Sequence, residues 1–315
     1  MSKIRVCFLG TPDFALTSLK ALLEDEHYDV VGVVTQPDRP AGRKLQLTPS
    51  PVKLLALSRG LKVLSPESLK ENQLMVDAIH TWKAEVAVVV AFGQILSEDF
   101  MKLFNFGAVN IHGSILPRWR GAAPIQRALE AGDLESGVTL QKIVKKLDAG
   151  DILGIRKCDL SEDMNALDLH NKLAKLGAEL LKVELMDYLR GNLAGISQDE
   201  SHVTFARKID KSEAEISWKS SARQLHNKVR AFVMGPGTFT NFQGKKLKIH
   251  KTKIISENTK NKDIGTVVDV RPGSLVIQCG TGHLEILEVQ PESRNRMSID
   301  DFLKGQNLKS GVPFQ

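Results

Sequence analysis

The residues best suited to chemistry are an asparagine and a histidine that stand two positions apart in the run Ala108–His112. If this apolar run forms a strand, Asn110 and His112 point to the same face of its sheet. An asparagine amide donates hydrogen bonds, and a histidine can donate or accept a proton near neutral pH. Together they could stabilise an oxyanion and move a proton, although either residue alone is more often a structural polar group.

An aspartate follows thirty-six residues after the histidine, as Asp148 in the segment Leu147–Leu153. A carboxylate that meets His112 would fix the tautomer of its ring. Asp151 is a competing carboxylate in the same segment, and an aspartate close to a glycine is also common in ordinary turns. The residues alone therefore leave the choice between the two carboxylates open.

The segment Ser114–Ile125 contains helix-breaking residues directly before a predicted helix. Irregular backbone at the edge of a sheet exposes N–H and C=O groups that a flat heterocycle could bind. The side chains of Arg118, Trp119 and Arg120 could also bind an anion or stack on a ring. The alternative is an ordinary loop that joins a strand to a helix.

A second long loop, Gln36–Pro49, carries three cations, Arg39, Arg43 and Lys44, together with three prolines and a glycine. Such a loop could be an arm that becomes ordered on a nucleic acid. The alternative is a solvated loop without a partner.

Several kinds of site are excluded by the motifs that the chain lacks. Gly10–Phe14 follows the first apolar run without a GxGxxG pattern, and Pro12 removes a backbone N–H that a phosphate would use, so no dinucleotide site is expected. Walker A, HExxH and GxSxG motifs are also missing. Cys7, Cys158 and Cys279 are far apart, which argues against a disulfide framework and a structural zinc site and favours the cytoplasm. We expect no bound metal.

The charge is unevenly distributed along the chain. Residues 207–315 contain 19 lysines and arginines against 11 aspartates and glutamates, whereas residues 1–206 contain 24 against 26. The basic excess of the C-terminal third points to a polyanionic partner, and the alternative is a merely soluble, lysine-rich surface.

The first part of the chain alternates between strands and helices. Short apolar runs predict strands at Ile4–Leu9, Val30–Thr35, Val63–Leu64, Glu85–Phe92, Ala108–His112, Val138–Val144 and Asp151–Cys158. Helical patterns between most of them indicate a Rossmann-like α/β domain over residues 1–190, with a mostly parallel sheet and helices on both faces. Ligands of such sheets bind beyond the carboxyl ends of the strands, which is where Asn110 and His112 fall.

The pattern changes after residue 190. The polar segment 191–206 is expected to be a linker, and one helix near Trp218–Phe232 opens a second domain at 207–315. Short strands separated by turn residues then predict a small β-barrel. No run approaches the ~20 apolar residues that span a membrane. Nothing in the sequence demands more than a monomer.

Taken together, these motifs resemble the methionyl-tRNA formyltransferase family, which uses 10-formyltetrahydrofolate. The resemblance rests on Asn110-x-His112, on Asp148 in a DxGDIL setting, and on the runs GTPDFA, TQPDRPAGR and SILPRWRGAAPIQRA that begin at residues 10, 35 and 114. It extends over the whole chain, including the basic C-terminal domain.

The resemblance implies a role for each matching residue. Asn110, His112 and Asp148 correspond to the catalytic trio. The segments that would contact the folate are Phe92, Gly93, Gln94, Ile95 and Leu96, whose backbone would hold the pterin ring, and Ser114, Ile115, Leu116 and Pro117. Arg43, with Lys44 and Arg39, would approach the acceptor stem of methionine-charged initiator tRNA. An OB-like C-terminal barrel would provide a basic surface for the same tRNA. Lys146 departs from the family, which usually has glycine there.

Three other functions share some of these features. A formyltransferase acting on a small amine, such as an amino sugar nucleotide or glycinamide ribonucleotide, would use the same trio but would not need a basic barrel. An RNA-binding protein with a silent enzyme fold would keep the basic surface without the chemistry. A hydrolase that releases formate would admit water in place of the amine.

Overall fold

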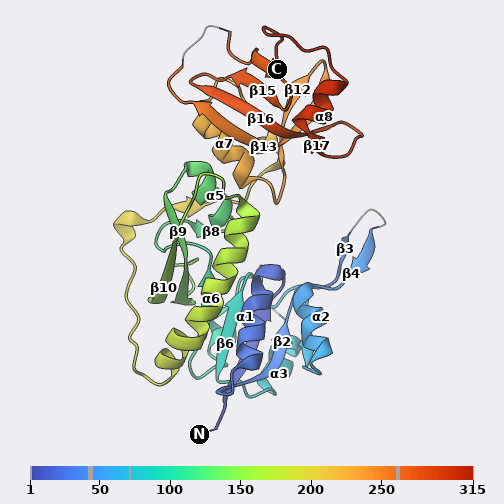
Figure 1. Cartoon of the computed structure of the whole chain (residues 1–315). Coiled ribbons are helices and arrows are strands. Elements are labelled where there is room, and N and C mark those ends of the chain that lie inside the picture. The colour runs from blue at the N-terminus through green and yellow to red at the C-terminus, as the bar shows by residue number, and fades with distance from the viewer. Residues whose placement is uncertain (1, 42–44, 71, 260–262, 315) are drawn as a thin grey trace. The chain divides into compact units, whose positions relative to one another are not determined.

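The computed structural model describes residues 2–41, 45–70, 72–259 and 263–314 (Figure 1). The chain folds into two compact units. Unit 1 comprises Met1–Gly121, Ser136–Cys158 and His170–Phe205. Unit 2 comprises Ala122–Glu135, Asp159–Leu169 and Ala206–Gln315.

Unit 1 is built on a seven-stranded sheet in the order β10-β9-β7-β6-β1-β2-β5. Its strands are β1 (Ile4–Gly10), β2 (Tyr28–Val34), β5 (Val63–Leu64), β6 (Val86–Val90), β7 (Ala108–His112), β9 (Glu135–Lys142) and β10 (Ile152–Asp159). β1 pairs in parallel with β2 and β6, and β6 pairs in parallel with β7. β9 pairs with β7 in the antiparallel direction. The predicted mostly parallel sheet is therefore confirmed.

The middle of this sheet is completely buried. Every residue of β6 is buried, because helices cover the sheet and leave neither face of this strand to solvent. Two strands away from β6, Gly32 of β2 leaves room for an indole: a Cβ at this position would lie 2.3 Å from the Trp82 ring.

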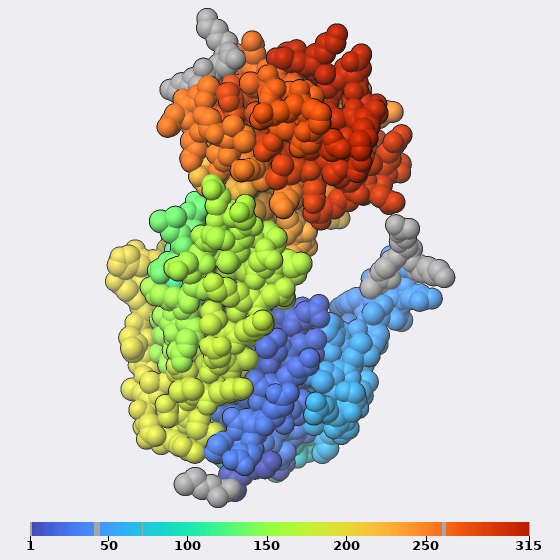
Figure 2. Space-filling view, viewed as in Figure 1, coloured from blue at the N-terminus to red at the C-terminus, as the bar shows by residue number. Residues whose placement is uncertain are grey.

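The helices of unit 1 are α1 (Asp13–Glu24), α2 (Pro51–Ser58), α3 (Gln73–His80), α4 (Glu98–Met101) and most of α6 (Ala166–Leu189), whose first turn belongs to unit 2. Ser50 caps α2, because its hydroxyl accepts from the Lys53 N–H and a proline follows at the first helical position. α1 and α6 adjoin in Figure 2, where they are dark blue and yellow-green. The rings of Phe14 in α1 and His170 in α6 have centroids 5.3 Å apart. Within the part of the chain that the structure describes, none of the helices has both the length and the apolar character needed to cross a membrane.

The loop expected at Gln36–Pro49 contains a small hairpin instead. β3 (Arg39–Ala41) pairs with β4 (Gln46–Thr48), and Figure 1 shows them extending beyond the rest of unit 1. Proline-rich stretches predict loops, but proline is tolerated in such a hairpin because each strand has a free edge that needs no N–H donor. Arg43 and Lys44 lie outside the described residues.

The segment expected to be a linker, 191–206, folds along unit 1. Ile196 exchanges two backbone hydrogen bonds with Ile152, at 2.8 and 2.9 Å. A short 3-10 helix (Glu200–His202) follows, and the Thr204 carbonyl then accepts from the N–H of Arg120, which begins β8 (Arg120–Gly121). Residues 196–204 are fixed against β8 and β10 because their backbone groups form these hydrogen bonds. The division into domains at residue 190 stays a prediction.

Unit 2 combines helices from distant parts of the sequence with an antiparallel sheet. The helices are α5 (Pro124–Ala131), α7 (Ala222–Ala231) and α8 (Ile299–Lys304), and the main strands are β12 (Thr238–Phe242), β13 (Lys245–Ser256), β14 (Val267–Arg271), β15 (Ser274–Gln278) and β16 (His283–Pro291). The five main strands pair in the order β12-β13-β16-β15-β14, and β17 (Met297–Ser298) pairs with β16. Closure of this sheet into an OB-like barrel stays a prediction.

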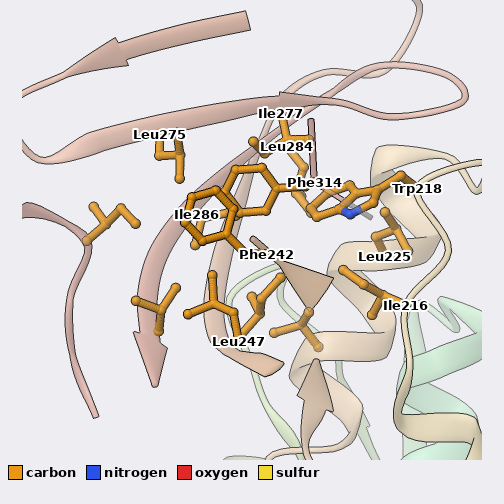
Figure 3. Packing of buried hydrophobic residues seen from close by; sticks show 14 of the residues in the cluster. Ile216, Trp218, Leu225, Phe242, Leu247, Leu275, Ile277, Leu284, Ile286 and Phe314 are labelled. Atoms are coloured by element: carbon orange, nitrogen blue, oxygen red, sulfur yellow. The ribbon is translucent and has the colours of Figure 1, made fainter. Parts of the chain in front are cut away.

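The core of unit 2 centres on three aromatic side chains (Figure 3). The rings of Phe242 and Phe314 stack with centroids 4.6 Å apart, and Trp218 meets Phe314 edge-on at 6.2 Å. The Trp218 indole N–H donates to the Thr240 hydroxyl, so its polar atom is satisfied although the side chain is buried.

A buried histidine in α7 joins two other parts of unit 2. The Nε2 atom of His226 lies 3.1 Å from the Glu162 carbonyl, and its Nδ1 atom lies 3.0 Å from the Thr252 hydroxyl. A neutral ring satisfies both contacts when Nε2–H donates and Nδ1 accepts. Burial lowers the pKa of His226 below its ordinary value, the Glu162 carbonyl opposes this, and the charge of Arg230 adds to the lowering.

We therefore expect acid to destabilise the chain through His226. Because the pKa of this group is lower in the folded than in the unfolded state, stability is present above about pH 6.5 and is lost as the pH falls, by at most about 1.4 kcal/mol per pH unit. Urea unfolding of the wild type and of His226→Gln, at several pH values on either side of this point, would measure the effect. An equal pH dependence in both proteins would contradict it.

Candidate active site

The predicted pair lies at the end of β7, where two neighbouring strands fix its surroundings. Antiparallel pairing places Gln141 of β9 opposite Asn110, and Thr139 opposite His112. Directly opposed residues in such a pair point to the same face, so the four side chains form one polar patch. The alternating strand pattern therefore predicted the shared face of Asn110 and His112.

His112 lies between a backbone carbonyl and a carboxylate. Its side chain is 7% exposed, its Nε2 atom lies 2.9 Å from the carbonyl oxygen of Trp119, and its Nδ1 atom lies 3.7 Å from Oδ1 of Asp148. The ring can donate from both nitrogens only when it carries two protons. The surroundings are therefore suited to a ring that accepts and returns a proton.

Asp148 is placed by a turn between β9 and β10. Its Oδ2 atom accepts from the Gly121 backbone N–H at 2.8 Å, and its Oδ1 atom accepts from the Gln141 side-chain amide at 3.1 Å. Its φ of +49° is in the left-handed region, where aspartate is one of the better-tolerated residues. These two donors point the carboxylate at the histidine.

The competing carboxylate has other partners. Asp151 lies 3.5 Å from the Lys142 ammonium and accepts from the Ser197 hydroxyl. Of the two candidates that the sequence left open, the structure therefore brings Asp148, and not Asp151, to His112.

Asn110 differs from its neighbours in β7, because it is half-buried while they are buried. Among the described residues, its side-chain amide has no hydrogen-bond partner. A donor at the edge of a sheet without a partner is available to a ligand. The site thus combines a free amide donor with a histidine that can move a proton, which suits a reaction in which negative charge develops on an oxygen.

The first predicted folate segment follows β7 directly. Ser114 and Leu116 are buried and use their polar groups internally: the Ser114 hydroxyl donates to the Arg118 carbonyl, and the Leu116 N–H donates to the Thr139 hydroxyl. Ile115 and Pro117 are half-buried. The turn that follows brings the Trp119 carbonyl to the histidine, with a left-handed φ of +65° at Trp119. Contact of residues 114–117 with folate stays a prediction.

The second predicted folate segment, residues 92–96, follows β6. Phe92 and Leu96 are buried, whereas Ile95 is 83% exposed. The Gln94 amide anchors the loop, because it accepts from the Leu69 N–H at 2.8 Å and donates to the Pro66 carbonyl at 3.1 Å. Since β6 and β7 are adjacent and parallel, both predicted folate segments leave the sheet at the same edge.

Of the three predicted tRNA contacts, only Arg39 is described. Its guanidinium lies 2.8 Å from the Glu67 carboxylate, and both side chains are exposed. Arg43 and Lys44 fall on the undescribed residues 42–44. On the same hairpin, Leu45 and Leu47 expose most of their apolar side chains.

Sequence reasoning missed the groups that hold the trio in place. Gln141 was not singled out, although it is buried and donates to Asp148. The Trp119 carbonyl and the Gly121 N–H are backbone groups without a side-chain signal. The alternation of strand β9 was the one available clue, because it places Thr139 and Gln141 on the same face.

Comparison with known proteins finds relatives over nearly the whole chain. A family model described as formyl transferase matches residues 2–185, and one described as the formyl transferase C-terminal domain matches residues 208–307. A methionyl-tRNA formyltransferase from Bdellovibrio bacteriovorus is 65% identical over 99% of this chain and 98% of that protein. One from Methylococcus capsulatus is 45% identical over 97% and 98%.

Solved structures of N-formyltransferases share the fold. WlaRD, a sugar 3N-formyl transferase studied with dTDP and 5-N-formyl-THF, matches 94% of this chain and 100% of its own with a TM-score of 0.68 and 20% identity. An N-formyltransferase from Helicobacter canadensis, in complex with folinic acid and dTDP-3-aminofucose, matches 91% and 99% with a TM-score of 0.69 and 19% identity. At these identities the similarity shows the fold alone.

The turn that carries Asp148 should depend on Gly150. A Cβ at this position would lie 1.8 Å from the Lys142 carbonyl oxygen, so Gly150→Ala must displace the turn. We expect the free energy of unfolding to fall by about 1–3 kcal/mol and the separation of His112 and Asp148 to increase. Urea unfolding and a crystal structure of the variant would measure both.

The matched control is Gly305→Ala, because the nearest atom to a Cβ there is 3.8 Å away. It should change stability by no more than about 0.5 kcal/mol. Wild-type stability and an unchanged separation in Gly150→Ala would show that the close approach is not a constraint.

Proposed function

This chain belongs to the methionyl-tRNA formyltransferase family, and we propose that it transfers the formyl group of 10-formyltetrahydrofolate to the α-amino group of methionine on initiator tRNA. The 65% identity with a methionyl-tRNA formyltransferase over nearly the whole of both chains supports the substrate. The geometry that carries the chemistry is the unpartnered Asn110 amide beside a histidine that faces Asp148. Cys7, Cys158 and Cys279 form no disulfide within the described part of the chain, which suits the reducing conditions of the cytoplasm.

The two segments at the sheet edge fit a folate co-substrate. When bound, 10-formyltetrahydrofolate supplies a formyl group that is already activated. Residues 92–96 and 114–117 would hold it, since both leave the carboxyl ends of adjacent parallel strands, where ligands of such sheets bind. The exposed Ile95 offers apolar surface there for a ring.

The trio can then divide the work of the transfer. The Asn110 amide donates to the formyl oxygen as negative charge develops on it. His112 supplies a proton, while the Trp119 carbonyl and the Asp148 carboxylate orient its ring. The pair of His112 and Asp148 can take one proton from the attacking amine and return one to the leaving nitrogen, so the exchange of protons balances.

One strand of unit 2 supports a nucleic acid as partner. In β13, Lys246, Lys248, Lys251 and Lys253 are exposed, while Leu247 and other alternate residues are buried. A strand that exposes a row of lysine side chains on one face suits the phosphates of an RNA. A small amine would need no such surface.

The deciding experiment mixes the protein with 10-formyltetrahydrofolate and methionine-charged initiator tRNA, with uncharged tRNA and free methionine as controls. Formyl transfer to the charged tRNA alone would support the proposal. Transfer to an amino sugar nucleotide or to glycinamide ribonucleotide, or release of formate without transfer, would overturn the tRNA assignment. Binding of tRNA without turnover would indicate a silent RNA-binding protein.

We expect Asn110→Ala and His112→Ala each to lower kcat by ~10²–10³, the usual cost of removing an oxyanion donor. Both substrates should bind as before, because the lost interaction forms mainly as charge develops. Steady-state kinetics of the purified variants would show this. Exposed Asn192→Ala and His80→Ala serve as controls. A variant of the trio that keeps wild-type kcat would lose its assigned role.

Arg43 is proposed to contact the tRNA. We expect Arg43→Ala to raise the KM for charged tRNA. It should also reduce the slope of log affinity against log salt concentration by about 1, the value for one phosphate contact. Binding titrations at several salt concentrations would measure the slope. Lys102→Ala, which removes an exposed lysine paired with Asp99, is the control. Unchanged kinetics and slope in Arg43→Ala would refute the contact.

A further inference from the structure

We propose that the segment Gln198–Thr204 positions the catalytic pair, through Gln198 on one side of His112 and Thr204 on the other. The inference deepens the proposed function and rests on it. The segment belongs to the polar stretch after α6 that the sequence indicated to be a linker.

Gln198 holds the turn that carries Asp148. Its side-chain N–H groups donate to the backbone carbonyls of Asp148 at 2.9 Å and Gly150 at 2.8 Å. Its side-chain oxygen accepts from Nε and Nη2 of Arg120, at 3.0 and 2.8 Å. One amide therefore joins the Asp148 turn to the residue after Trp119.

Arg120 makes this junction rigid, because its side chain is fully buried. A buried cation is costly unless it is paired and hydrogen-bonded. Glu200 provides the charge, at 2.9 Å from Nη2 of Arg120, and it also contacts the Lys146 ammonium, two residues before Asp148. The bonds from Lys146 and then Arg120 hold the pKa of Glu200 below its ordinary value. The segment is thus tied to the Asp148 turn a second time.

Thr204 holds the other side of the histidine. Its hydroxyl accepts from the Trp119 N–H at 2.9 Å, and its carbonyl accepts from the Arg120 N–H at 2.9 Å. These bonds fix the backbone on both sides of the Trp119 carbonyl, which lies 2.9 Å from Nε2 of His112. Trp119 has a left-handed φ, a conformation that needs support from its surroundings.

The two acceptors that flank His112 are therefore set by one short segment. Gln198 and Thr204 act through Asp148 and Trp119, so they are positioning residues. Misplacing a catalytic group by about 1 Å can cost roughly a hundredfold in rate. A substitution in this segment should consequently change kcat and the hydrogen bonding of the His112 ring, rather than substrate binding.

The first test compares Thr204→Val with Thr204→Ser. Valine keeps the shape and removes the acceptor for the Trp119 N–H, whereas serine keeps it. We expect Thr204→Val to lower kcat for charged tRNA by roughly tenfold or more, with both KM values within about twofold, and Thr204→Ser to restore most of it. Ser201→Ala, whose hydroxyl bonds to Asp199, is the control from the same segment.

The second test reads the ring directly. ¹⁵N signals of His112, assigned by their loss in His112→Ala, should shift in Thr204→Val of the ligand-free protein. Gln198→Glu is the second variant, because it places an oxygen against the carbonyls of Asp148 and Gly150 while keeping an acceptor for Arg120. It should shift the same signals and lower kcat.

Three results would overturn the inference: unchanged kcat in both variants, a rise in KM without a fall in kcat, or a fall in kcat with unchanged ring signals. A wild type that transfers no formyl group to charged tRNA would refute the proposed function instead. The ring signals of the variants would still decide the positioning role in that case.

Discussion

The carboxylate of Asp148 faces His112 because a backbone N–H from Gly121 and an amide from Gln141 hold it in place. The turn that carries Asp148 maintains this arrangement. The turn accepts a left-handed aspartate, and Gly150 lets the chain pass against Lys142. The histidine can then be fixed from its second nitrogen by a carbonyl. A flexible carboxylate would orient the His112 ring less well, and proton transfer through this ring would become less efficient.

Local patterns in the sequence predicted the parts of this site that lie on one strand. Apolar runs indicated the strands, and alternation placed Asn110 and His112 together at a carboxyl edge. The resemblance to known formyltransferases selected Asp148 over Asp151. Composition also predicted a basic C-terminal part, and the structure has an exposed row of lysines on β13.

The supporting groups could not be predicted, because they depend on contacts between distant parts of the chain. Gln198 is 50 residues from Asp148, and Thr204 is 85 residues from Trp119. A polar segment rich in such residues looks like a linker unless its partners are known. Likewise α8 has six residues and β17 has two, so their patterns are too short to distinguish from turns.

The composition of unit 2 from three separate stretches of the chain limits how the protein can be divided. α5 precedes much of unit 1 in the sequence, yet Arg127 of α5 meets Glu213, and Gly132 lies against Asn227 of α7. A fragment ending at residue 190 would keep α5 and lose both partners. A single proteolytic cut near residue 190 would therefore leave α5 in contact with the C-terminal piece, and expression of residues 1–190 alone would expose the part of α5 that normally meets Glu213 and Asn227.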